Sequence, residues 1–248
     1  MGCRSAASEV TVWWMELGSP PASVIAQWRS DLDSAERAQA DRFYFEEDQS
    51  TYIAAHWLIR NALASVGGLP AEDWRFIAEK HGKPRIDPSL GRPELAFNLS
   101  HTRGFVACAI GVGMMIGIDV ESLSRNSPGL DIAERFFSPL EVAILRGTPW
   151  DQRPQTFFRL WTLKEALIKA TGEGLSRELD SFSFSLEPVS ITFHPDNADE
   201  STKWKFIERR PTAQHLLAIA IRQSAARPVK LSICPIRQPS VRAESCGM

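Results

Sequence analysis

Apolar residues recur along the chain with two different periods, and together they predict an alternation of helices and strands. Helical spacing marks residues 52–66 and 156–171, each followed by glycine. Residues 34–42 form a further expected helix with Ser34 as its cap, and Ser138 with Pro139 predicts another helix start. Strand-like runs cover residues 10–15, 95–99, 105–110, 114–120, 182–186, 190–193, 204–208 and 216–221. The proline-containing tail from about residue 225 is expected to be irregular.

The two halves of the chain resemble each other. Residues 56–67 align with residues 161–172, and the apolar run 105–110 resembles 216–221 at a later point in the same order. Chance similarity between amphipathic helices is the alternative explanation. A duplication predicts an α+β pseudo-dimer of two similar halves, residues 1–114 and 115–248, each a small antiparallel sheet packed with helices. A ligand is then expected in the cleft between the halves.

Charge and cysteine content narrow the class of protein. Lys plus Arg is 28 and Asp plus Glu is 30, with no run of five like charges, so we expect no nucleic-acid partner. No apolar run reaches the ~18 residues of a membrane-spanning helix, and the polar N-terminal residues do not resemble a signal peptide. The four cysteines form no C-x-x-C pair. We therefore expect a cytoplasmic protein without a membrane partner.

Two acidic side chains share one face of the predicted strand 114–120 and the residue after it. Ile116, Ile118 and Val120 alternate with Gly117, Asp119 and Glu121, so the carboxylates of Asp119 and Glu121 point to the same side. A solvated edge strand is one explanation of this pattern. A cation held between the two carboxylates is the other.

The predicted helix 156–171 carries a charged face beside its apolar stripe. Leu160, Leu163 and Leu167 form the stripe, whereas Glu165 and Lys169 lie one turn apart on the adjacent face. These two charges can be a simple surface ion pair. Alternatively, Glu165 joins the two strand carboxylates as an oxygen ligand of a hard cation such as Mg²⁺, which combines carboxylates with substrate phosphates.

A polar segment, residues 98–102, is expected in the connection between two strands. It either forms a turn or contacts phosphate. His101 with Lys80, His81 and Lys83 would then form a small cationic cluster suited to a substrate with several phosphates.

In combination these segments indicate a protein family more specifically than any one of them does. The chain contains, in this order, HGKPRI, FNLSHT, IGIDVES, RFFSPLE and FFRLWTLKEALIKATGEGLS. It resembles the 4′-phosphopantetheinyl transferases of the surfactin-synthetase-activating type over roughly residues 34–221. The resemblance implies Mg²⁺-dependent transfer of phosphopantetheine from coenzyme A to a serine of an apo acyl or peptidyl carrier protein, with release of adenosine 3′,5′-bisphosphate. It also implies a monomeric pseudo-dimer with coenzyme A and Mg²⁺ between its halves.

The resemblance also implies roles for individual residues. Asp119, Glu121 and Glu165 would bind Mg²⁺, and Glu165, Lys169 and His101 would act in catalysis. The expected coenzyme A site comprises Lys80, Lys83, Asn98, Leu99, Ser100, His101, Asp119 and Lys169. The chain departs from the family pattern at Gln39, Thr51 and His56, where Arg or Lys is expected, which predicts weaker coenzyme A binding.

Two other functions agree with parts of this pattern. A Mg²⁺-dependent phosphohydrolase also needs clustered acids, although no segment resembles a hydrolase motif. A coenzyme A-binding regulator would have lost catalysis, yet all three carboxylates and Lys169 are present.

Overall fold

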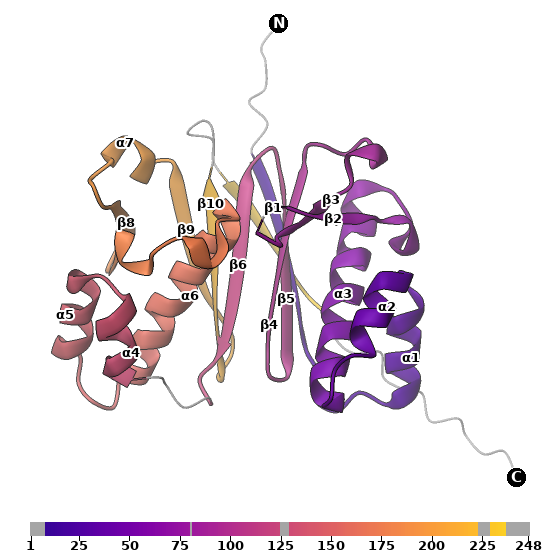
Figure 1. The fold of residues 1–248 in the computed structure, drawn as a ribbon, viewed down its shortest axis with the longest axis horizontal. Helices are drawn as coiled ribbons and strands as arrows, with labels where there is room; N and C mark the ends of the chain where they lie inside the picture. The colour runs from indigo at the N-terminus through magenta and orange to yellow at the C-terminus, as the bar shows by residue number, and fades with distance from the viewer. Residues whose placement is uncertain (1–7, 80, 125–128, 223–228, 237–248) are drawn as a thin grey trace, which may run out of the picture.

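Two small sheets lie side by side at the centre of the molecule, and helices cover their outer faces (Figure 1). The computed structural model describes residues 8–79, 81–124, 129–222 and 229–236. The first sheet has the order β11-β1-β5-β4 and the second has the order β6-β10-β9. Their strands are β1 (Ser8–Glu16), β4 (Leu95–Thr102), β5 (Phe105–Val112), β6 (Met115–Ser122), β9 (Trp204–Thr212), β10 (His215–Arg222) and β11 (Val229–Pro235).

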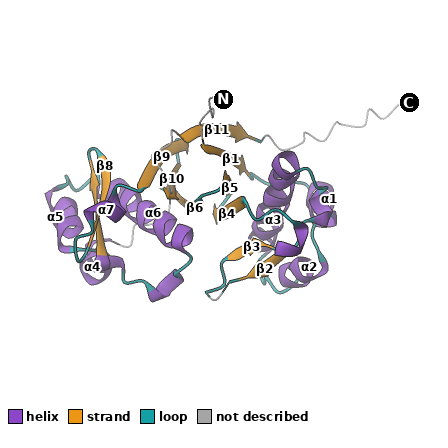
Figure 2. Ribbon diagram, turned by 90° about the horizontal axis from the view of Figure 1, so that it is seen from above, coloured by secondary structure: helices purple, strands orange, loops and turns teal. Residues whose placement is uncertain are grey.

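The helices and two short hairpins complete the fold, with α3 and α6 on opposite sides of the sheets (Figure 2). The α-helices are α1 (Ala22–Ser30), α2 (Ser34–Ala40), α3 (Glu46–Gly67), α4 (Gly129–Phe136), α5 (Pro139–Gly147), α6 (Arg153–Thr171) and α7 (Ala198–Ser201). The hairpin strands are β2 (Phe76–Ala78) with β3 (Pro84–Ile86), and β7 (Phe182–Leu186) with β8 (Val189–Phe193). No helix in the described ranges is long and apolar enough to cross a membrane.

The order of elements is the same in both halves of the chain. Each half runs from a first strand through helices to a two-stranded hairpin and two final strands. In each sheet the last of these strands lies in the middle, giving β1-β5-β4 and β6-β10-β9. This repeated topology confirms the predicted α+β pseudo-dimer. The aligned runs 105–110 and 216–221 fall on the equivalent strands β5 and β10.

Part of the C-terminal tail contradicts the prediction that it is irregular from about residue 225, whereas residues 225–228 and 237–248 lie outside the described residues. Residues Val229–Pro235 form β11, which pairs in parallel with β1 and so joins the sheet of the N-terminal half. Val229 and Leu231 pack against the core between the two sheets. Burial of these two apolar side chains favours the extended conformation of the segment. Proline does not prevent this pairing, because Pro235 is the last residue of a strand at the edge of its sheet.

Three apolar cores hold the layers together. The central core lies between the sheets and contains Val12, Phe105, Ile118 and Leu217. A second core lies under α1 and α3, and a third lies under α4, α5 and α6. The predicted α6 stripe of Leu160, Leu163 and Leu167 is fully buried in the third core.

Local capping differs from the prediction at one helix and agrees at another. Asp33, not Ser34, caps α2, because its carboxylate accepts the backbone N–H of Glu36, whose own carboxylate accepts the Asp33 N–H. Ser138 and Glu141 form the same reciprocal pair at α5, as predicted for Ser138.

The strand β4 extends further than predicted. Thr102 pairs with Phe105, so the turn contains only Arg103 and Gly104. Gly104 takes a left-handed φ of 73°, which a tight hairpin turn favours. Ser100 and His101 therefore belong to a strand, not to the connection in which they were expected.

Gly117 allows α6 to approach β6 unusually closely. A Cβ atom at this position would overlap the carbonyl oxygen of Ala166 and the amide nitrogen of Ala170, both backbone atoms of α6. We expect Gly117→Ala to lower the free energy of unfolding by about 1–3 kcal/mol, because neither backbone group can move without shifting the helix. Urea unfolding followed by circular dichroism measures this change.

Gly147→Ala is the matched control for this prediction. Gly147 ends α5, and no heavy atom lies within 4 Å of the position that a methyl group on it would take. Its replacement should leave stability unchanged or slightly higher. Equal stability of the two alanine variants would show that the close approach of α6 to β6 at Gly117 does not exist.

Candidate active site

The centre of the candidate site is Asp119, at the place where β6 faces β4 of the other half. The side chain is buried, with 5% of the residue exposed. Lys169 Nζ donates to Asp119 Oδ1 at 2.7 Å and to Ser100 Oγ at 2.9 Å. Ser100 Oγ in turn donates to the same Asp119 oxygen at 3.0 Å. Three elements, β4, β6 and α6, thus bring one side chain each to a single cluster.

Glu165 lies one helical turn before Lys169 and is half-buried. Its pKa is raised, first by burial and then by the negative charge of Asp119, with a smaller contribution from Glu121. Lys169 opposes this shift. The three predicted carboxylates therefore share one electrostatic environment. The alternative of a Glu165–Lys169 surface pair is wrong, because Lys169 forms its ion pair with Asp119.

The donor atoms at this cluster suit Mg²⁺. Asp119 Oδ2 is buried without a hydrogen-bond partner, which leaves one carboxylate oxygen available as a ligand. In the described part of the chain, no three His, Cys, Asp or Glu side chains converge as a ready-made metal centre. Mg²⁺ commonly takes one or two protein carboxylates and completes its shell with water and substrate phosphate. Asp119 with Glu165 or Glu121 fits that kind of site.

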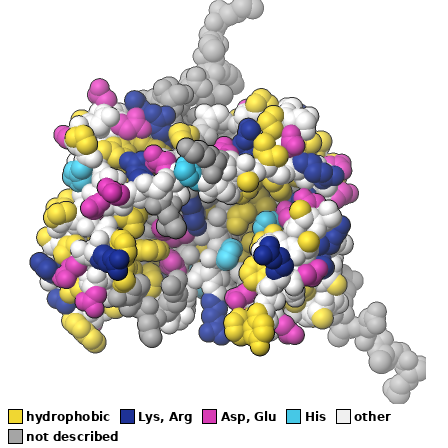
Figure 3. Space-filling model, viewed as in Figure 1, with side chains coloured by type: hydrophobic (Ala, Val, Ile, Leu, Met, Phe, Trp, Pro, Cys, Tyr) yellow, Lys and Arg dark blue, Asp and Glu magenta, His cyan; other side chains and the backbone are white. Residues whose placement is uncertain are grey.

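His101 lies near this cluster at the end of β4, on the side of α3. Its imidazole keeps accessible surface, but the crowding of protein around it removes part of its hydration and lowers its pKa. The charge of Lys169 lowers that pKa further, as does His56 on α3. Charged side chains of both α3 and α6 therefore influence the pKa of His101. The molecule is hollowed between its halves on this face, and charged and histidine side chains gather there (Figure 3).

Two of the remaining predicted ligands of coenzyme A, Lys83 and Asn98, form hydrogen bonds with the protein itself. Lys83 Nζ donates to the Ala170 carbonyl at 2.8 Å and lies 3.5 Å from the Ile116 carbonyl oxygen. Burial lowers the pKa of this lysine. Asn98 Oδ1 accepts the Ile118 N–H at 2.9 Å. Leu99 packs into the core under α3, and Lys80 is outside the described residues.

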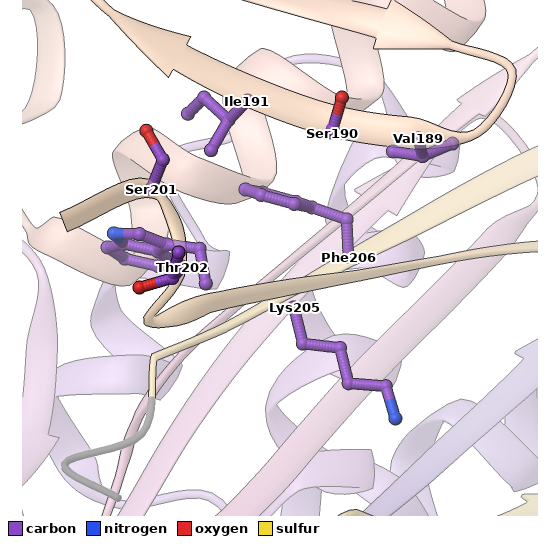
Figure 4. A pocket seen from close by; sticks show the side chains of 8 residues that line it. Val189, Ser190, Ile191, Ser201, Thr202, Lys205 and Phe206 are labelled. Atoms are coloured by element: carbon purple, nitrogen blue, oxygen red, sulfur yellow. The ribbon is translucent and has the colours of Figure 1, made fainter. Parts of the chain in front are cut away.

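A cavity of about 330 Å³ is lined by residues of both halves, among them Lys83, Phe97, Ile116 and Thr171. Its position agrees with the expectation of a ligand between the halves. A pocket of about 370 Å³ lies elsewhere, between β8, α7 and β9, and Figure 4 shows the side chains around it. None of the predicted site residues lines that second pocket.

Two buried ion-pair clusters were not predicted from the sequence. Lys164, next to Glu165, is fully buried and pairs with Glu141 at 2.8 Å. Arg60 is fully buried on α3 and pairs with Asp33 and Glu36. The capping pattern of Asp33 with Glu36 was the available signal for the second cluster. The ion pairs themselves could not be predicted, because the partners are far apart in sequence.

The comparisons with known proteins agree with this arrangement. A model of the 4′-phosphopantetheinyl transferase superfamily matches residues 115–220, and a model of the N-terminal part of 4′-phosphopantetheinyl transferase matches residues 19–112. The 4′-phosphopantetheinyl transferase HetI of Nostoc sp. is 34% identical over 213 residues, covering 86% of this chain and 87% of the relative. The 4′-phosphopantetheinyl transferase Sfp of Bacillus subtilis is 38% identical over 160 residues, covering 64% of this chain and 69% of the relative.

The two family matches, together with the pseudo-dimeric fold, define one class of enzyme. The chain belongs to the 4′-phosphopantetheinyl transferase superfamily and is a phosphopantetheinyl transferase, as the sequence motifs predicted. The two matched ranges meet at the turn between β5 and β6.

Proposed function

We propose that this enzyme transfers the 4′-phosphopantetheine group of coenzyme A to a serine of an apo acyl or peptidyl carrier protein, with Mg²⁺, and releases adenosine 3′,5′-bisphosphate. The observation that carries the proposal is the buried Asp119 carboxylate. One of its oxygens is held by Lys169 and Ser100, and the other has no partner. Such a group beside a second carboxylate suits a substrate that brings pyrophosphate oxygens and a cation.

In the proposed reaction, the serine oxygen attacks the β-phosphorus of coenzyme A. The bond from this phosphorus to the bridging oxygen breaks, and that oxygen leaves with the nucleotide. Glu165 accepts the serine proton with an oxygen that the metal leaves free, either directly or, because a bound metal would lower the basicity of this carboxylate, through a water. Lys169 neutralises charge on the pyrophosphate. His101, which is exposed, anchors the nucleotide.

Mg²⁺ would be held by Asp119 with Glu165 and Glu121. When bound, it supplies Lewis-acid stabilisation of the charge on the pyrophosphate oxygens. Asp119 contributes its unpartnered oxygen to this site. The hydrogen bonds from Lys169 and Ser100 hold the carboxylate in one orientation.

Incubation of an apo carrier protein with the enzyme, coenzyme A and Mg²⁺, followed by mass spectrometry, tests the proposal. The carrier should gain the mass of one phosphopantetheine group. Breakdown of coenzyme A without this gain would identify a phosphohydrolase, and binding without either change would identify a coenzyme A-binding regulator. A panel of acyl and peptidyl carrier proteins then identifies the preferred acceptor. The cytoplasmic location and the monomeric state stay predictions, the second testable by light scattering.

The roles of the two charged residues on α6 can be separated by kinetics. We expect Glu165→Gln to lower kcat by at least about 100-fold, because a general base contributes about that much or more. Lys169→Ala should lower kcat because it removes positive charge from the transition state, and saturating coenzyme A should not restore the rate.

Steady-state rates on one carrier protein, with melting temperatures for each variant, measure these effects. Glu178→Gln is the control, since Glu178 is exposed and lies away from the cluster. A kcat of Glu165→Gln equal to that of the wild type would remove Glu165 from the mechanism.

A further inference from the structure

Two aromatic side chains project from the surface of the protein where α3 begins. Tyr44 is 91% exposed and Phe45 is 64% exposed. Their rings contact each other edge to face, with centroids 5.0 Å apart. The preceding residue, Phe43, is half-buried and packs on Tyr52 of α3, with ring centroids 5.3 Å apart. This contact anchors the segment, so the exposed pair is held in a defined place.

Neither exposed ring contributes to the folding of the chain. Phe45 directly precedes the first residue of α3, but its side chain makes no capping hydrogen bond. Over the described ranges, neither ring belongs to one of the three apolar cores. Exposure of large apolar side chains to water is unfavourable, and aromatic residues are enriched in protein–protein interfaces. The pair is therefore a candidate contact for a partner.

The start of α3 lies close to the candidate active site. Glu47, in the first turn of α3, pairs with Arg103 in the turn between β4 and β5 at 3.2 Å. Burial, the largest effect, lowers the pKa of His101, and the negative charge of Asp48 opposes that shift. An interaction of this kind requires a short separation. The first turn of α3 therefore borders the hollow between the halves (Figure 3).

We propose that Tyr44 and Phe45 form a docking contact for the apo carrier protein and bind apolar side chains next to its acceptor serine. The proposal rests on the function proposed above. In that reaction the serine has to reach a phosphorus held between the halves, so the carrier surface around the serine meets the rim of the hollow. Small ligands bury most of their surface in concave sites, whereas these rings project outward, which favours a protein partner.

The size and charge of this surface favour a transient partner over a second copy of the chain. An aromatic side chain buries about 150–250 Å², so the exposed part of the pair supplies roughly 300 Å². A stable interface takes about 800 Å² on each partner. The first turn of α3 also carries Glu46, Glu47 and Asp48. Two copies that met through the pair would bring these like charges together, which is unfavourable.

Tyr44→Ala and Phe45→Ala test the docking contact. Each should lower kcat/KM for the carrier protein about tenfold, as truncation of an aromatic interface residue does, and the double variant should lose more. The kcat at saturating carrier protein and the KM for coenzyme A should stay near their wild-type values. Tyr44→Phe keeps the ring and should keep most of the wild-type kcat/KM. Melting temperatures should not change, because both rings are exposed.

Val66→Ala is the matched control. Val66 is also an apolar residue of α3, is 41% exposed, and lies roughly 30 Å along the helix from the pair. Binding can be measured separately from transfer with a carrier protein whose acceptor serine is replaced by alanine. In calorimetry, this carrier should bind the double variant more weakly by the same factor that kcat/KM loses, and should bind Val66→Ala as it binds the wild type.

The outcomes separate this proposal from the function on which it rests. A wild-type kcat/KM for the carrier protein in the double variant would overturn the docking contact, although transfer itself would uphold the proposed function. A raised KM for coenzyme A alone would identify a nucleotide contact, and a dimer in light scattering that the double variant loses would identify an interface between copies. Either result would overturn the inference.

A wild-type enzyme that binds the carrier protein without modifying it would refute the proposed function. Calorimetry with the double variant would still decide the docking contact. A wild-type enzyme that binds no acyl or peptidyl carrier protein would overturn it.

Discussion

Replacing Asp119 with alanine should lower the transfer rate by at least about 1,000-fold. It removes the carboxylate that pairs with Lys169 and that would also bind Mg²⁺. A bound cation contributes several kcal/mol to transition-state stabilisation, and each ~1.4 kcal/mol corresponds to a factor of ten in rate. The change also leaves Lys169 and Ser100 without the carboxylate oxygen to which both donate. Transfer to one carrier protein and Mn²⁺ binding to the free variant measure the two losses.

The fold should survive this substitution. Asp119 Oδ2 is already buried without a partner, so removing the carboxylate relieves one desolvation cost, and the Lys169 side chain, which is 29% exposed, can be solvated by water once its pair is broken. A melting temperature near that of the wild type is therefore expected. Asp151→Ala is the control, because Asp151 lies exposed before α6. Undiminished Mn²⁺ binding in Asp119→Ala would exclude Asp119 as a metal ligand.

Replacing Lys164 with methionine should have the largest effect on stability, with a loss of about 3–5 kcal/mol in the free energy of unfolding. Lys164 and Glu141 are both fully buried, and the lysine also donates to the carbonyl oxygens of Leu179 and Phe182. Without the lysine, the Glu141 carboxylate stays buried with only its bonds from Ser138 and the Phe184 N–H. Chemical denaturation measures the loss.

A second substitution at Glu141 separates the cost of an unpaired charge from the cost of lost packing. Lys164→Met combined with Glu141→Gln removes both charges and should be more stable than Lys164→Met alone, because replacing both partners avoids a buried unpaired ion. Lys205→Met, at an exposed position on β9, is the control for the change in side-chain type. If Lys164→Met unfolds at the wild-type denaturant concentration, the buried pair contributes nothing to stability.

Local periodicity was sufficient to predict which side chains of the site share a face when they belong to one strand or one helix. Alternation placed Ile116, Ile118 and Val120 in the core, which leaves Asp119 on the opposite face of β6. Helical spacing likewise placed Glu165 and Lys169 on one face of α6 beside a buried stripe of leucines. These inferences hold because side-chain direction in a regular element follows from residue number alone.

The extent of an element was predicted less well where tertiary packing decides it. Ser100 and His101 were expected in a loop because polar residues favour turns, yet pairing with β5 extends β4 to Thr102. The segment Val229–Pro235 was expected to be irregular because of its prolines, yet it has an edge of β1 available and forms β11. For β4 the partner is the next strand of the same hairpin, and for β11 it is a strand from the other end of the chain; in both cases the pairing overrode the turn-favouring or proline-containing local sequence.

The family, the duplicated α+β plan and the faces of the charged residues were all predictable from local sequence patterns. That Lys169 binds Asp119 and not its helical neighbour Glu165, and that Asn98 and Ser100 bind the edge of β6, depends on how the elements pack. Spacing within an element predicts neighbours on that element, whereas a hydrogen bond goes to whichever partner packing brings within about 3 Å. At this site the partners come from β4, β6 and α6, which are distant in sequence and meet only when the two halves pack together.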